Sequence, residues 1–116
     1  MFKLCRVDLK GIQKIFEGIE NYKKIVIKEI NPKKIILFGS FARGDINESS
    51  DVDLIVIADW KEDFLERIKI LLELNKFKIP LEPLGYTEEE FEKLIKEGNS
   101  FILKVLNEGK IIYQAK

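Results

Sequence analysis

The chain has 116 residues, 46% of them apolar and 34% charged, which is enough for one domain (1–116) with a single core and too apolar for a disordered chain. Acidic and basic residues balance at 20 each, so the basic excess typical of nucleic-acid-binding proteins is missing and we expect no direct binding to nucleic acid. With no histidine and one cysteine, Cys5, the sequence excludes histidine-based nucleophilic catalysis, histidine-based zinc sites and an internal disulfide. No apolar run is long enough to span a membrane and residues 1–10 do not form a signal peptide, so we expect a protein of the reducing cytoplasm.

The first half of the chain predicts one long helix and two central strands. Asp8 can cap a helix over about residues 8–30, in which apolar residues recur at steps of three and four and form one stripe: Ile12, Ile15, Phe16, Ile19, Tyr22 and Val26. Asn31-Pro32 ends it, because the residue before a proline avoids the helical region. Short β-branched runs then predict strands at 33–38 and 52–58, with one helical turn at 40–43 and a polar loop at 44–50 between them.

The second half predicts a helix at 61–74 and a third strand at 77–84. A capping box at Thr87 then begins a helix that ends at about Lys96. Ser100 caps a last helix through Leu106, and a short strand follows at 110–113. Pro80 and Pro83 cannot donate to a sheet ladder, so the third strand is expected at an edge or with a bulge. This order of elements predicts an α/β (α+β) fold, a small mixed sheet flanked by helices.

A pair of carboxylates stands where the second central strand begins. Asp51 and Asp53 lie two positions apart, and residues with that spacing on a strand point to the same face. Two like charges so close repel each other, and a divalent cation would relieve the repulsion; oxygen ligands without histidine or cysteine select Mg²⁺, or Mn²⁺ in its place. Taken alone, the pair is more typical of two aspartates that cap a loop and face water.

A Gly-Ser turn follows the first central strand. Gly39 lets the backbone turn sharply and approach a ligand closely, and the helical turn after it offers free N–H groups and the Ser40 hydroxyl to phosphate oxygens. Alone, this dipeptide is more typical of a simple strand-to-helix turn. Gly39 and Gly44 have the spacing of the two P-loop glycines, but Asp45 and Ile46 stand where a P-loop needs lysine and serine or threonine, which excludes that motif.

The combination is far more specific than its parts. A strand, Gly-Ser, Ala-Arg-Gly, a gap from Phe41 to Ser50, Asp-x-Asp and a second strand together resemble the signature of the minimal nucleotidyltransferases of the DNA polymerase β superfamily. The later segment 86–91, Tyr-Thr-Glu-Glu-Glu-Phe, is also similar to archaeal and bacterial members. The resemblance covers roughly residues 30–113 and implies a polymerase-β-like fold with its catalytic core at about 33–113.

The resemblance implies a role for each motif residue. Gly39 and Ser40 would hold the phosphates of ATP, and Asp51 and Asp53 would be catalytic and carry two Mg²⁺ ions. Glu82 is the candidate for the superfamily's third catalytic, metal-binding carboxylate, although many relatives have aspartate there and the flanking prolines leave its direction open. Arg43 either binds nucleotide phosphate or anchors the loop by pairing with Asp45 or Asp51.

The same resemblance implies an enzyme and a partner. Little chain remains for an acceptor-binding domain, so the acceptor is expected on another molecule. In the resembling family the partner is a helical HEPN-domain ribonuclease toxin, and the nucleotidyltransferase acts as antitoxin of a type VII toxin–antitoxin system by transferring AMP from ATP to a tyrosine. Such a Mg²⁺-dependent protein adenylyltransferase, in a hetero-oligomer with its HEPN partner, is the first hypothesis. The alternatives are a module with a weak or inactive site that neutralises its partner by binding, and a small-molecule nucleotidyltransferase.

Overall fold

The computed structural model describes residues 9–116, so Cys5 and the expected helix cap Asp8 lie outside the described residues. The elements are α1 (Leu9–Ile30), β1 (Lys34–Phe38), α2 (Ser40–Arg43), β2 (Val52–Ile57), α3 (Phe64–Glu73), β3 (Leu81–Tyr86), α4 (Glu88–Lys96), α5 (Ser100–Glu108) and β4 (Lys110–Gln114). No helix within the described part of the chain is long and apolar enough to cross a membrane.

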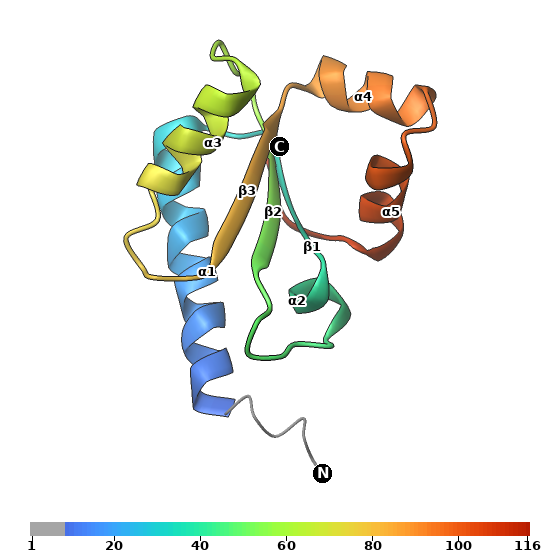
Figure 1. Ribbon diagram of the computed structural model, residues 1–116. Coiled ribbons are helices and arrows are strands. Elements are labelled where there is room, and N and C mark those ends of the chain that lie inside the picture. The colour runs from blue at the N-terminus through green and yellow to red at the C-terminus, as the bar shows by residue number, and fades with distance from the viewer. Residues whose placement is uncertain (1–8) are drawn as a thin grey trace.

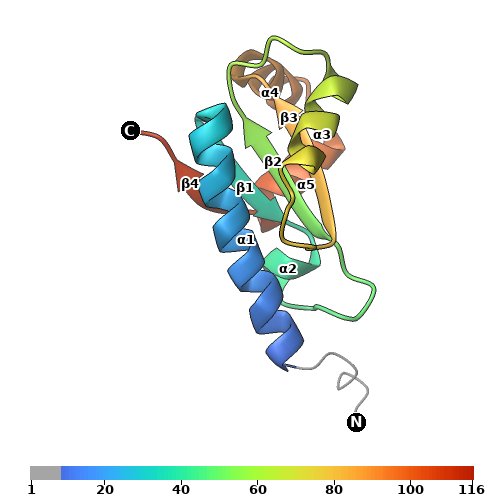
Figure 2. The ribbon, with the colours of Figure 1, turned by 90° about the vertical axis from the view of Figure 1, so that its left-hand side faces the viewer.

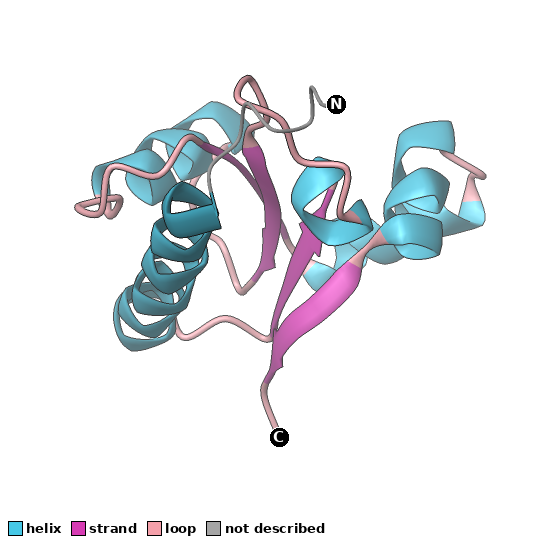
Figure 3. Cartoon of the chain, turned by 90° about the horizontal axis from the view of Figure 1, so that it is seen from below, coloured by secondary structure: helices cyan, strands magenta, loops and turns pink. Residues whose placement is uncertain are grey.

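The four strands form one mixed sheet in the order β3-β2-β1-β4. β1 pairs antiparallel with β2 and with β4, whereas β2 pairs parallel with β3. The predictions of a mixed sheet and of an edge position for the proline-containing third strand are therefore confirmed. Helices α1 and α3 cover one face of the sheet and α4 and α5 the other, as Figures 1 and 3 show.

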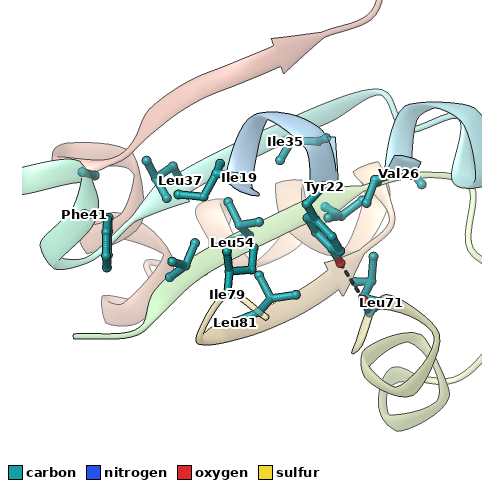
Figure 4. Close-up of a cluster of buried hydrophobic side chains, with 14 of the residues drawn as sticks. Ile19, Tyr22, Val26, Ile35, Leu37, Phe41, Leu54, Leu71, Ile79 and Leu81 are labelled. Carbon is teal, nitrogen blue, oxygen red and sulfur yellow. Dashed lines mark hydrogen bonds between the residues drawn. The ribbon is translucent and has the colours of Figure 1, made fainter. Parts of the chain in front are cut away.

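The larger core lies between the sheet and α1, which runs across this face in Figure 2. The apolar stripe of α1 faces the sheet: Ile19, Tyr22 and Val26 are buried against Leu54 and Leu71 (Figure 4). The Tyr22 hydroxyl donates a 2.7 Å hydrogen bond to the carbonyl of Leu71, so this buried polar group is satisfied. Burial raises the pKa of the Tyr22 phenol, which keeps it neutral. A smaller core fills the space between the sheet and α4 and α5.

Three predicted helix starts, caps or strand starts were wrong, each for a local reason, and β3 also ends at Tyr86 rather than at 84. α3 begins at Phe64 rather than 61, because the Asp63 side chain caps it by accepting from the Glu66 amide. α5 is capped by Asn99, whose side chain accepts from the Ile102 amide, and not by Ser100. β3 begins at Leu81 rather than 77, because Lys78 has a left-handed backbone with φ of 55° that a strand does not allow. The capping box at Thr87 is present as predicted.

Candidate active site

The Gly-Ser turn places backbone against a carboxylate. Gly39 follows β1 and precedes α2 with φ of 75°, a conformation that side chains disfavour, and a Cβ at this position would collide with Oδ2 of Asp53. Glycine is therefore required twice here, for its backbone angle and for the approach of Asp53. Within the described chain no side chain caps α2, so its first N–H groups remain available to an acceptor such as a phosphate oxygen.

The sheet register brings Asp53 and Glu82 together. Asp53 pairs with Phe38 of β1 on one side and with Glu82 of β3 on the other, so the three side chains stand on the same face of adjacent strands. This face is the one covered by α4 and α5, because the alternate residues Val52 and Leu54 belong to the core beneath α1. The structure thus places Glu82 beside Asp53.

Asp51 lies one residue before β2 and is exposed, whereas Asp53 is half-buried within the strand. The negative charges of the three carboxylates nevertheless interact. Partial burial, and after it the charges of Glu82 and Asp51, together raise the pKa of Asp53 from 3.8 to about 6, while Arg43 opposes the shift. Among the described residues, Asp53 has two like charges nearby and no ion pair of its own.

The donor set suits a hard divalent cation. Carboxylate oxygens are the ligands that Mg²⁺ prefers, and a cation would remove the repulsion that raises the pKa of Asp53. Among residues 9–116, no three acidic, histidine or cysteine side chains converge into a ready-made metal cage. Asp51, Asp53 and Glu82 fit a metal by chemistry and by charge, and binding would have to draw the side chains together.

Arg43 is held by two carboxylates. Its Nε donates to Asp45 at 3.2 Å and its Nη1 donates to Glu108 at 2.8 Å, and these hydrogen bonds raise the pKa of the guanidinium, Glu108 contributing most. The loop-anchoring alternative is thus realised through Asp45 rather than Asp51. The partner Glu108 at the end of α5 was not foreseen, because nothing in the sequence relates positions so far apart.

An apolar groove of about 370 Å³ adjoins the carboxylates, and sequence reasoning missed it. Asp53 and Glu82 line it together with Phe38 of β1, Ile68 and Leu72 of α3, and Phe101 of α5. The rings of Phe38 and Phe101 meet edge to face with their centroids 5.5 Å apart. The only signal in the sequence was that α3 and α5 carry more apolar residues than their buried stripes need.

Comparison with known proteins decides the family. The model of the family described as polymerase beta, nucleotidyltransferase matches residues 20–116. The chain belongs to this polymerase beta nucleotidyltransferase family.

Relatives of this nucleotidyltransferase occur in Methanocaldococcus jannaschii. One candidate protein adenylyltransferase is 41% identical over 83 residues, which covers 70% of this chain and 78% of the relative. A second is 36% identical over 101 residues, covering 82% and 95% respectively.

Solved structures share the nucleotidyltransferase fold at low identity. A candidate nucleotidyltransferase from Sulfolobus solfataricus superposes with a TM-score of 0.64 at 13% identity, over 95% of this chain and 92% of that one. A toxin–antitoxin structure with AMP-PNP has a TM-score of 0.54 at 20% identity, over 84% and 74%. The predicted polymerase-β-like fold is confirmed.

Proposed function

We propose that this nucleotidyltransferase transfers AMP from ATP to a tyrosine hydroxyl of a partner protein, and that the partner is a HEPN-domain toxin which the transfer inactivates. The observation that carries the proposal is the placement of Asp53, which touches Gly39 on one side and adjoins Glu82 on the other. The similarity to candidate protein adenylyltransferases and to a toxin–antitoxin structure supports the choice of acceptor and partner.

In this reaction the chain would position ATP and the acceptor and would supply electrostatic stabilisation, rather than a covalent nucleophile. Gly39 and Ser40 would receive the phosphates of ATP at the uncapped start of α2. Asp51, Asp53 and Glu82 would hold Mg²⁺, which when bound offsets phosphate charge and lowers the pKa of the acceptor hydroxyl. The acceptor oxygen bonds to the α-phosphorus, the bond from that phosphorus to the β-phosphate oxygen breaks, pyrophosphate leaves with the electron pair, and the hydroxyl proton passes to water.

Intact mass spectrometry of the protein encoded beside this one, after incubation with this chain, ATP and Mg²⁺, tests the proposal. The partner should gain whole AMP units with wild type, and Asp53→Asn should slow the transfer at least 10²–10³-fold, the effect of losing one preorganised electrostatic group. Asp59→Asn is the matched control, because Asp59 is an exposed aspartate after the same strand and should leave the rate unchanged.

A second candidate, a module that neutralises by binding alone, is favoured by one observation: within residues 9–116 the acidic side chains do not converge into a metal cage. Complex formation measured beside the mass shift separates the two. A partner of unchanged mass in a tight complex, equally neutralised by wild type and Asp53→Asn, would establish the binding module and refute the enzyme.

A further inference from the structure

The apolar groove beside the carboxylates begins at Phe38 of β1, next to the Gly-Ser turn, and extends past Asp53 and Glu82 to α3. Its lining contains Asp53 and Glu82 but no residue from 39 to 51, the segment that would receive the phosphates. It continues over the edge strand β3 to Ile68 and Leu72 of α3. Since the sheet order is β3-β2-β1, these two residues lie on the side of Asp53 opposite to β1 and Gly39.

The groove exposes apolar side chains that do not contribute to the buried core. Leu72 keeps 45% of its surface exposed and Phe101 keeps 40%, and both line the groove next to two carboxylates. Large apolar side chains that remain exposed beside a polar site are typical of a surface that another molecule covers.

The direction of the groove matches one of the two ligands of the transfer. In an in-line displacement the attacking oxygen and the leaving group stand on opposite sides of the phosphorus. If the leaving phosphates lie at Gly39 and Ser40, the attacking hydroxyl reaches the carboxylates from the other side. The end of the groove formed by Ile68 and Leu72 adjoins the carboxylates on that side.

The lining also restricts the chemistry of the acceptor. It includes two carboxylates and no lysine or arginine, so it repels a phosphorylated or nucleic-acid acceptor. Apolar walls disfavour a sugar, whose hydroxyls would lose water without gaining partners. Serine and threonine are too short to cover the walls, whereas tyrosine carries its hydroxyl at the far end of a rigid apolar ring.

We infer that this groove is the acceptor site of the enzyme and takes a tyrosine side chain, with Leu72 and Phe101 as specificity-determining walls. The inference rests on the proposed transfer of AMP to a tyrosine, and it adds where on this chain that tyrosine lies. A tyrosine seated there has Leu72 and Phe101 as the walls around its ring and directs its hydroxyl at Asp53 and Glu82.

A binding experiment tests the site without requiring turnover. The probe is N-acetyl-tyrosinamide, added to methyl-labelled protein with Mg²⁺ while the methyl resonances of Ile68 and Leu72 are followed by NMR. These resonances should shift with the probe, shift far less with N-acetyl-serinamide, and stay in place when the non-hydrolysable nucleotide AMPCPP is added alone. Shifts caused by AMPCPP alone would overturn the inference, because the groove would then hold the nucleobase.

A kinetic experiment uses matched variants on the same helices. Leu72→Glu and Phe101→Ala should raise the KM for N-acetyl-tyrosinamide about tenfold or more, since one apolar contact changes discrimination by roughly 10–200-fold, with the KM for ATP unchanged. The controls Leu65→Glu on α3 and Leu106→Ala on α5 alter exposed apolar residues outside the groove and should change neither constant.

The two proposals fail in different ways. If wild type adenylylates tyrosine but the groove variants keep its KM, the acceptor binds elsewhere and the inference is wrong while the function stands. If wild type transfers nothing but the probe still shifts Ile68 and Leu72, the groove is confirmed as a tyrosine site and the proposed reaction is wrong. If the probe shifts neither residue, the inference fails irrespective of activity.

Discussion

Two charged clusters of this small domain illustrate opposite ways of placing charge in a fold. Arg67 on α3 is 6% exposed, yet its guanidinium donates to both carboxylate oxygens of Glu90 and to the backbone carbonyls of Glu62 and Gly85. Asp53, half-buried on the same sheet, meets the like charges of Glu82 and Asp51 instead.

The pKa shifts of the two carboxylates differ in sign for this reason. Hydrogen bonds from Arg67 lower the pKa of Glu90 below its ordinary value, so the fold stabilises that charge. Burial and neighbouring carboxylates raise the pKa of Asp53 to about 6, so the fold disfavours that charge. The Arg67 cluster joins α3, β3 and α4 and is structural, whereas the Asp53 cluster keeps at neutral pH a repulsion that a cationic ligand would relieve.

The largest effect on stability is expected for Gly39→Ala. A left-handed backbone costs about 1–2 kcal/mol for a residue with a Cβ, and displacing Asp53 adds a similar amount, so unfolding free energy should fall by about 3 kcal/mol in urea denaturation. Gly44→Ala is the matched control: its φ is 92° but a Cβ would meet nothing within 4 Å, so it should lose only the backbone part. Equal losses in both variants would show that Asp53 does not press on Gly39.

Glu90→Gln should cost about 2 kcal/mol, because it leaves a buried guanidinium without its charge partner. The deficit should depend on pH. Since the folded pKa of Glu90 is lowered from 4.5, the stabilisation is complete above 4.5 and is lost as pH falls through the folded pKa. Chemical denaturation from pH 7 to pH 3 should therefore show wild type and variant converging in acid. Glu89→Gln, an exposed neighbour, should stay within about 0.5 kcal/mol of wild type.

Asp53→Asn, which should abolish transfer, is expected to stabilise the fold by about 1 kcal/mol at pH 7. The carboxylate is disfavoured only when ionised, so the gain should be absent below pH 3.8 and complete above about 6. Thermal unfolding at pH 3.5 and pH 7 measures it. Added Mg²⁺ should raise the melting temperature of wild type more than that of the variant; a variant less stable than wild type at pH 7 would contradict the account of a stored repulsion.

The smallest change in stability is expected for Arg43→Gln, because exposed ion pairs contribute little. The effect of the Arg43→Gln variant on activity instead distinguishes the two possible roles of Arg43. If Arg43 only anchors the loop, Arg43→Gln and Glu108→Gln should change the KM for ATP equally. If the guanidinium also binds phosphate, Arg43→Gln alone should raise that KM, and Glu108→Gln should leave it unchanged or lower it. Steady-state kinetics at physiological salt distinguish these outcomes.

The sequence by itself determined the order of the elements, the mixed sheet and the local motif around Asp51 and Asp53. These depend on short-range patterns: apolar periodicity, Asn31-Pro32 as a helix end, and the capping box at Thr87. The edge position of the third strand also followed from local chemistry, because Pro83 cannot donate to a neighbour.

Tertiary structure decided what depends on pairing between distant segments. The register that sets Asp53 opposite Glu82 is a property of the parallel β2–β3 pair, and Glu82 could be named from the sequence only through resemblance. Glu108, which pairs with Arg43, and Glu90, which pairs with Arg67, come from helices far along the chain. The groove beside Asp53 exists only because β1, β3, α3 and α5 each place an apolar side chain next to the carboxylates, and no window of sequence contains that arrangement.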